Sequence, residues 1–427
     1  MPPCLCTGDL ICCRSIDCFY SLGGEHQLIG TILKDRNLVL YFTGRFISSL
    51  GDNFLLFAQS IAAYLLTDSL AGVGALWIVR GVASLLLIPV GGVLTDRTNR
   101  KTIILVTDFI SGILSISYIF ITQGNHYWLL PLLAFASQSV NRFSSPALNA
   151  SFKDVSQNTD LEISGSFAAV LGQTAVIIGP VVASIIYFIF NGKTDILFIA
   201  DGVSFFISFI FMCGVYFGKR TNPESKKIHF YRDMFNGMNY VKENKPLLFL
   251  IILLIPIALT GKTFEVLVLG ISEMKWGIGT IGGIGIYLSL FALGGIVGST
   301  QIHKWKHLMN RRRFYAVSTM VLGLLFILMG LLDYLWVSLL ITFFVGVFSN
   351  VTVTMAQIHI QKTVENNYLG RVFSAWTLLA VIGGGVGAYL SGLFYDQFGL
   401  RVSLILFGAF IAVPYAICFL IVWLKRI

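Results

Sequence analysis

Charged residues are scarce in this sequence. Asp, Glu, Lys and Arg make up 12% of its 427 residues, whereas soluble domains average roughly 25%. Hydrophobic residues make up 56%. A chain with so few charges cannot cover its apolar surface in water. The composition therefore excludes the ordinary soluble classes and predicts an all-α integral membrane protein.

The sequence also lacks the motifs with which many enzymes bind nucleotides, metals or acyl groups. It has no phosphate-binding glycine loop, no Gly-x-Ser-x-Gly element and no metal-binding aspartate pair. His303 and His307 are spaced by four in a basic loop, and we interpret them as solvated rather than metal-binding. We expect no cofactor, no metal site and no direct hydrolysis of ATP.

Cysteine is concentrated at one end of the chain. Five of the seven cysteines lie in the first 18 residues, where no basic region precedes an apolar core as in a signal peptide. Residues 1–35 are predicted to be a reduced cytoplasmic tail. Palmitoylation and metal binding are the alternatives for its cysteines.

Long apolar runs dominate the rest of the chain. A membrane-spanning helix needs about 20 apolar residues to cross a hydrocarbon core of about 30 Å. Twelve such segments are predicted: 38–66, 70–94, 102–122, 127–152, 164–190, 195–217, 246–270, 278–301, 314–333, 335–358, 372–396 and 402–425.

The positive charge is distributed unevenly among the expected loops. Of the 30 Lys and Arg, three lie in loops on one side (Lys193, Lys275 and Arg401) and four within the apolar segments (Arg45, Arg80, Arg142 and Lys262). The others lie on the side of the N-terminus. Positively charged loops face the cytoplasm, so both termini are expected there. The net charge of +9 is accounted for by orientation in a lipid bilayer, and we expect no nucleic-acid partner.

Polar residues form stripes on several of the apolar segments. Arg45, Asp52 and Gln59 are seven apart and share one helical face. A polar stripe is costly against lipid and should face a bundle interior or a water-filled path. Further stripes contain Gln138, Arg142 and Asn149 in segment 127–152, Lys262 and Glu265 in segment 246–270, and Asn350 and Gln357 in segment 335–358.

A short basic turn connects the second and third segments. Residues 92–101 read Gly-Val-Leu-Thr-Asp-Arg-Thr-Asn-Arg-Lys. This pattern resembles the signature loop between helices 2 and 3 of Major Facilitator Superfamily transporters, and the matching residues are Gly92, Asp96, Arg97, Arg100 and Lys101. Ser48–Asp52, Tyr231–Leu248 and Leu369–Phe373 resemble the bacterial macrolide-efflux and enterobactin-exporter-like branch.

The resemblance implies two six-helix pseudo-repeats. A shift of 209 residues pairs Lys153 with Lys362 and Asn158 with Asn367, as expected for parallel repeats. The predicted domains are the N-terminal bundle, the cytoplasmic linker with an amphipathic surface helix, and the C-terminal bundle: 36–218, 219–245 and 246–427.

The resemblance further implies a secondary transporter that is not an enzyme. We expect a monomeric, proton-coupled exporter of a small amphipathic compound, a drug such as a macrolide or a siderophore, in a bacterial inner membrane. Uptake and lipid movement are the alternatives within transport. A membrane-embedded enzyme is disfavoured by the missing nucleophile, and a sensor by the missing soluble domain.

The implied site residues fall into four groups. Asp52 is the expected proton-coupling residue and Glu265 the competing candidate. The turn residues, together with Asp154 as an ion-pair partner for Arg97 or Arg100, are expected to gate the inner side. Gly179 and Pro180 mark either a functional bend or a packing kink. The expected cavity residues are Gln59, Arg80, Gln138, Arg142, Asn149, Lys262, Asn350 and Gln357.

Overall fold

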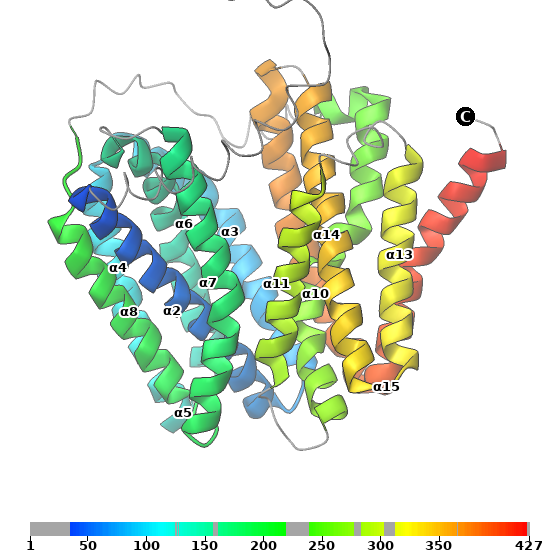
Figure 1. Cartoon of the computed structure of the whole chain (residues 1–427), viewed down its shortest axis with the longest axis horizontal. Helices are drawn as coiled ribbons and strands as arrows, with labels where there is room; N and C mark the ends of the chain where they lie inside the picture. The colour runs from blue at the N-terminus through cyan, green and yellow to red at the C-terminus, as the bar shows by residue number, and fades with distance from the viewer. Residues whose placement is uncertain are drawn as a thin grey trace, which may run out of the picture.

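The computed structural model describes residues 35–123, 126, 128–156, 161–218, 239–276, 283–302, 312–364 and 366–424 (Figure 1). All regular secondary structure in that part of the chain is α-helical. The helices are α2 (Arg36–Thr67), α3 (Leu70–Arg97), α4 (Arg100–Ser117), α5 (Ile119–Gln123), α6 (Leu129–Val155), α7 (Leu161–Ile189), α8 (Asp195–Gly214), α10 (Lys245–Trp276), α11 (Gly283–Thr300), α13 (Arg312–Leu331), α14 (Leu335–Thr363) and α15 (Asn366–Leu424).

Each of the twelve expected segments overlaps one of these helices. Eight stretches of the described chain are long and apolar enough to cross a membrane, and one of them, Ala375–Ala416, contains parts of the last two segments. α2 and α6 are long enough, at 32 and 27 residues, but they carry the charged stripes. The all-α membrane fold is confirmed.

The expected segments agree with the helices at two places where the helix bounds differ from them. Only the fully buried Tyr118 separates α4 from α5, and its φ and ψ of −63° and −19° are themselves helical, so segment 102–122 is one span. The last two segments both lie in α15, which changes direction between them at Gly399, whose φ of 75° favours glycine. The tail (residues 1–34) and most of the linker (residues 219–238) lie outside the described residues, so the surface helix stays a prediction.

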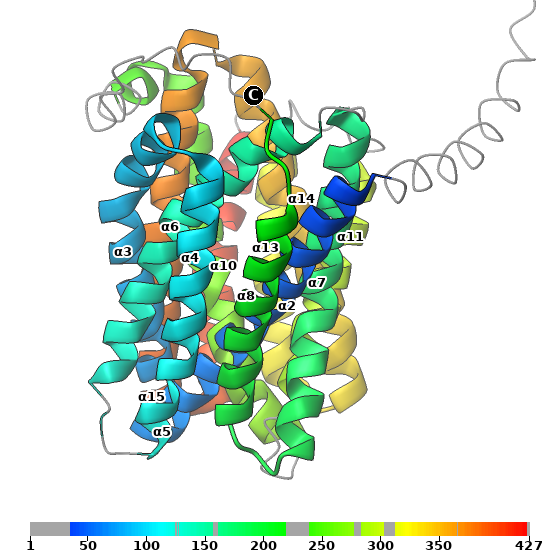
Figure 2. The ribbon, with the colours of Figure 1, turned by 90° about the vertical axis from the view of Figure 1, so that its left-hand side faces the viewer.

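The helices form two groups. Figure 1 shows α2–α8 on one side and α10–α15 on the other, with the groups approaching each other at the lower edge. Viewed from the side of the first group, α8 lies between α2 and α4 (Figure 2). Contacts between the groups are made mainly by α3 with α15 and by α7 with α11.

The buried apolar residues show where the groups join. One cluster combines residues of both groups, among them Phe57 and Leu70 with Phe264 and Tyr287. The second cluster lies wholly within α10–α15 and the segment just before α10. The third lies wholly within α2–α8 and the residues directly after α8. The groups therefore share a core at one end of the molecule and keep separate cores at the other.

The end with separate cores carries the basic residues, and we call it the basic end. α2 begins there after Asp35, whose carboxylate accepts a bond from the Asn37 backbone N–H at 2.9 Å. α3 ends there, and only Thr98 and Asn99 separate it from α4. The Asn99 side chain caps α4 by accepting from the Lys101 N–H at 2.9 Å. We call the opposite end, where α3 and α11 begin, the closed end.

Close helix contact within the second group depends on a reciprocal glycine pair. A Cβ on Gly294 of α11 would overlap the carbonyl oxygen of Phe343 in α14, and a Cβ on Gly346 of α14 would overlap that of Phe291 in α11. Small residues at such crossings let helix backbones approach closely in membranes.

We predict that Gly346→Ala lowers the thermal stability of the purified protein in detergent. Forcing a methyl group into this contact costs about 1–3 kcal/mol. The matched control is Gly172→Ala in α7, where an added Cβ meets nothing within 4 Å. Equal melting temperatures for Gly346→Ala and Gly172→Ala would contradict the assigned packing.

Candidate functional site

A cavity of about 760 Å³ lies between the two helix groups. Its walls extend from Trp77 and Lys262 in the middle of the bundle to Leu148 and Gln357 nearer the basic end. The first group contributes mostly hydroxyl, amide and charged side chains. The second contributes mostly apolar ones, including Phe373 and Trp376. The cavity is therefore polar on one wall and apolar on the other.

Positive charge is in excess in this cavity. Four cations line it against two carboxyl groups. The cations come from α2, α3, α6 and α10, and the carboxyl groups from α2 and α4. The cations are Arg45, Arg80, Arg142 and Lys262, and the carboxyl groups belong to Asp52 and Asp108.

Asp52 opens onto the cavity from the middle of α2. Among the described residues its carboxyl group makes no hydrogen bond and no ion pair, although it lies within electrostatic range of Arg45 and Arg80. Arg142, which also lines the cavity, is bound by Gln138 one turn before it in α6. With the Gln138 amide oriented to satisfy both groups, its oxygen accepts from Arg142 Nε at 2.9 Å.

Arg80 is held by a buried polar cluster behind the cavity wall. Its guanidinium donates to the side-chain oxygen of Gln59, and the Gln59 amide nitrogen donates to the Tyr118 hydroxyl at 2.5 Å. Gln59 is only 2% exposed and does not line the cavity. The structure therefore places it behind Arg80 rather than in the cavity.

Trp77 lies between two cations from different groups. Arg80 of the same helix is 5.1 Å from its ring centre, and Lys262 of α10 is 4.2 Å away. Both distances are within the range of cation–π attraction. Lys262 also donates to Glu265 Oε1 at 2.5 Å. The aromatic ring thus joins the two groups in the middle of the bundle.

Three other predicted residues lie in different pockets. Glu265 and Asn350 line a second pocket of about 510 Å³, beyond Trp77 from the central cavity. Asn149 lines a smaller pocket of about 270 Å³ against α7. Gln138 and Gln357 line the central cavity together with Arg142.

At the closed end, a carboxylate of one group caps a helix of the other. Asp396 of α15 accepts from Ser69 Oγ at 2.5 Å, from the Leu70 N–H at 2.9 Å and from the Ala71 N–H at 3.1 Å. The first N–H groups of a helix lack partners within it and carry partial positive charge. Asp396 satisfies two of them at the start of α3.

Two further polar contacts join the groups. Tyr64 of α2 donates to Glu273 of α10 at 2.8 Å, between the cavity and the closed end. Ser289 of α11 donates to the Ile177 carbonyl of α7 at 2.5 Å, along the α7–α11 contact on the other side of the bundle from α3 and α15 (Figure 2).

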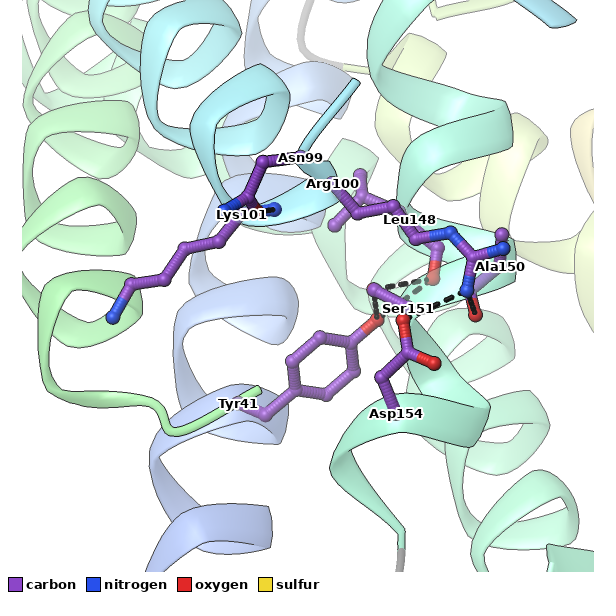
Figure 3. Close-up of polar contacts among 8 residues, drawn as sticks. All are labelled: Tyr41, Asn99, Arg100, Lys101, Leu148, Ala150, Ser151 and Asp154. Carbon is purple, nitrogen blue, oxygen red and sulfur yellow. Dashed lines mark hydrogen bonds and ion pairs between the residues drawn. The ribbon is translucent and has the colours of Figure 1, made fainter. Parts of the chain in front are cut away.

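At the basic end, the turn between α3 and α4 is tied to its own group (Figure 3). Arg100 donates to Asp154 at 2.7 Å and to the Ala150 carbonyl at 2.9 Å. Lys101 donates to the Cys213 and Val215 carbonyls at 2.9 and 2.8 Å. The side chains of Asp96 and Arg97, and Gly92, lie outside what the structure describes. The structure pairs Asp154 with Arg100.

Gly179 and Pro180 lie inside α7 where it contacts two other helices. A Cβ on Gly179 would lie 2.6 Å from the Asn53 Cβ, and the Pro180 carbonyl oxygen occupies the space that a Cβ on Gly285 of α11 would need. Both residues thus contribute to close packing, one within the first group and one between the groups.

Comparison with known proteins assigns the family. A model of the Major Facilitator Superfamily matches residues 41–299 and 269–426. The chain belongs to the Major Facilitator Superfamily.

Two relatives within the superfamily are exporters by name. A Bacillus subtilis protein named as a bacilysin exporter, BacE, is 24% identical over 348 residues, which cover 80% of this chain and 84% of that protein. Macrolide efflux protein A of Streptococcus pyogenes is 24% identical over 347 residues, with coverages of 77% and 82%. The predicted superfamily and the likeness to macrolide-efflux transporters are confirmed.

Solved structures of the superfamily share the fold. The nucleoside transporter NupG matches with a TM-score of 0.74 and 13% identity, over 91% of this chain and 99% of that one. A bacterial Spinster homologue, solved inward-facing and unoccupied, matches with a TM-score of 0.71 and 13% identity, covering 91% and 97%.

Two side chains of this superfamily member were not identified from its sequence. Asp108 is 4% exposed, accepts from Ser208 Oγ at 2.8 Å and lines the cavity. Asp396 is the last residue of the expected segment 372–396, and nothing in the sequence indicates that it caps another helix. Arg45, on the stripe of segment 38–66, lines the cavity.

We predict that Asp396→Asn opens the closed end of the transporter in part of the population. A partly buried charge at a helix N-terminus contributes up to about 2 kcal/mol, and 1–2 kcal/mol changes an equilibrium about 5–30-fold. The distance between spin labels on Leu65→Cys and Phe398→Cys, in a background without native cysteines, is measured by double electron–electron resonance. It should be longer in the Asp396→Asn variant than in the protein with Asp396.

Asp333→Asn is the control at the same end, because Asp333 pairs with Arg401 inside the second group. It should leave the label distances unchanged. An Asp396→Asn variant with the wild-type distance distribution would show that the cap does not hold this end closed.

Proposed function

We propose that this protein is a proton-coupled exporter of a small amphipathic compound, working by alternating access. The observation that carries the proposal is the central cavity. Residues of both groups line it, contacts between the groups separate it from the closed end, and its walls continue towards the basic end. A site between two repeats near the middle of the membrane is typical of alternating-access transporters.

The chemistry of the cavity favours an amphipathic compound with anionic or hydrogen-bond-accepting groups. Arg80, Arg142 and Lys262 supply positive charge on or beside the polar wall, and Phe373 and Trp376 supply an apolar surface opposite. A rigid compound with one polar and one apolar face satisfies both walls. A macrolide and a siderophore are the two classes to test, and the names of the relatives favour the antibiotic.

The basic end faces the cytoplasm in this proposal, because basic segments are retained on that side. The N- and C-termini then lie in the cytoplasm, and the structure corresponds to the state that loads substrate from inside. The halves 36–218 and 246–427 would rock around the site near the middle of the membrane, so that the closed end opens as the basic end closes. The turn at 92–101 would then approach α15 near Gly370, with Asp96 facing the start of that helix.

Proton coupling is assigned to Asp52 for a structural reason. Lys262 binds Glu265, Ser208 binds Asp108 and Ser115 binds Asp201 at 2.5 Å. Asp52 alone among these acids faces the cavity without a hydrogen-bond partner in the described chain. A carboxyl group exposed first to one side and then to the other can load and release a proton.

The direction of transport is tested in everted membrane vesicles. An exporter accumulates radiolabelled erythromycin, or an iron-free siderophore, inside such vesicles when a proton gradient is imposed. Accumulation only in right-side-out vesicles would support uptake instead. Movement of fluorescent phospholipid between leaflets, without accumulation of either compound, would support lipid transport.

We predict that Asp52→Asn still binds substrate and equilibrates it across proteoliposomes but no longer concentrates it under an imposed pH gradient. The amide keeps the size of the side chain and cannot cycle a proton. Ser48→Ala, which removes a cavity-lining hydroxyl one turn earlier, is the matched control and should retain accumulation. If Asp52→Asn accumulates substrate to the wild-type ratio, coupling resides elsewhere.

We predict that Arg142→Ala weakens substrate binding about 10–150-fold, since a hydrogen bond to a charged group contributes about 1.5–3 kcal/mol. Arg142→Lys should lose less, because it keeps the cation but not the planar donor set. Titration of the purified variants by calorimetry measures both. Wild-type affinity in both variants would make Arg142 a structural residue.

A further inference from the structure

The second pocket adjoins the central cavity, and Leu56 is among the residues that line both. It holds about 510 Å³ between α2 and α7 of one group and α10, α11 and α14 of the other. Trp77 lines both spaces and lies between them. We call this space the lateral pocket.

The lateral pocket is lined in part by α7 and α11, which lie side by side in Figure 1. These helices touch where Pro180 packs against Gly285 and where Ser289 binds the Ile177 carbonyl. Towards the basic end the pocket is lined by Val176, which is 44% exposed.

The walls of the lateral pocket are apolar with one charge. Phe57, Phe291 and several aliphatic side chains line it, and Glu265 is the one ionisable group among the described lining residues. The Glu265 side chain is 29% exposed, and its Oε1 accepts from Lys262. Lys262 itself lines the central cavity. The ion pair thus directs its cation to one space and its carboxylate to the other.

We propose that the lateral pocket is a second binding site of the transporter, for a lipophilic cation whose charge is held by Glu265. An apolar cavity with one carboxylate suits a hydrophobic compound with a single positive charge. The central cavity, with its excess of cations, disfavours the same compound. The two spaces therefore select opposite charge, and this site adds a substrate class to the proposed export function.

The test measures binding to the purified full-length protein by equilibrium dialysis. The probe is radiolabelled tetraphenylphosphonium, and the counter-probe is tetraphenylborate, which has nearly the same shape and the opposite charge. Wild-type protein should bind the phosphonium more tightly. Glu265→Gln should weaken its binding about ten-fold or more, because a partly buried charge pair is lost.

Lys262→Met should act in the opposite direction and tighten phosphonium binding, because it removes the cation that competes for Glu265. Glu265→Gln alone leaves Lys262 without its ion-pair partner and could prevent folding. The double variant Lys262→Met with Glu265→Gln removes both charges of the pair and therefore replaces the single variant in that case. It should bind the two probes with similar affinity.

Two substitutions of an alanine by phenylalanine show in which of the two spaces the cation binds. Ala292→Phe fills part of the lateral pocket, and Ala380→Phe fills part of the central cavity with the same side chain. Phosphonium binding should fall with Ala292→Phe and persist with Ala380→Phe.

Several outcomes would overturn the inference. Wild-type protein that binds no phosphonium excludes the site, and a larger loss with Ala380→Phe places the cation in the central cavity. Unchanged affinity in both charge variants, or equal affinity of wild type for tetraphenylborate, shows an apolar pocket without charge selection. The assay needs no transport, so vesicles that export nothing would refute the proposed function while leaving this result intact.

Discussion

A carboxylate from one half of the protein caps a helix of the other half, and the open shape of the molecule depends on that bond. The first N–H groups of α3 have no hydrogen-bond acceptor inside the helix. The Asp396 carboxylate accepts from two of them. The contact fixes α3 against α15 at the closed end. Because the helices are rigid, contact at that end leaves room for the cavity towards the basic end.

The cost of charge within the membrane organises the remaining polar residues. Most charged side chains within the helices have a polar partner nearby, as in Lys262–Glu265, Arg80–Gln59, Arg142–Gln138 and Asp108–Ser208. These pairings keep charges away from lipid and hold the cations around the cavity. Asp52 differs because it faces the cavity without such a partner in the described chain. An unpartnered acid in such a place is suited to exchange with a proton, which underlies the proposed coupling role.

Much of the fold could be predicted from the sequence, since apolar runs of membrane length leave few alternatives to a helix bundle. In the structure Asp52 and Arg142, from the stripes on segments 38–66 and 127–152, line a cavity wall. The helical period predicts which residues share a face, but it does not predict which neighbouring helix covers that face. For this reason Gln59, at the right spacing, lies behind Arg80, and Asn149 faces α7.

Contacts between distant helices could not be predicted from one sequence. Nothing local distinguishes Trp77 or Asp396 from other residues near helix middles and ends, because their roles depend on α10 and on the start of α3. The buried bond between Tyr118 and Gln59 likewise joins two helices through residues that are 59 positions apart in the sequence.

The division of the apolar core has a mechanical consequence. Each half retains its own packed cluster near the basic end, and only the first cluster described above, which contains Phe57 and Phe264, is shared. Relative movement of the halves would therefore separate the residues of the shared cluster and leave the packing within each half intact. The free-energy difference between the two open states of the transporter then depends on the shared cluster and on the contact surface that forms when this cluster separates. A few side chains in those two places can therefore set how long the transporter stays open to each side of the membrane.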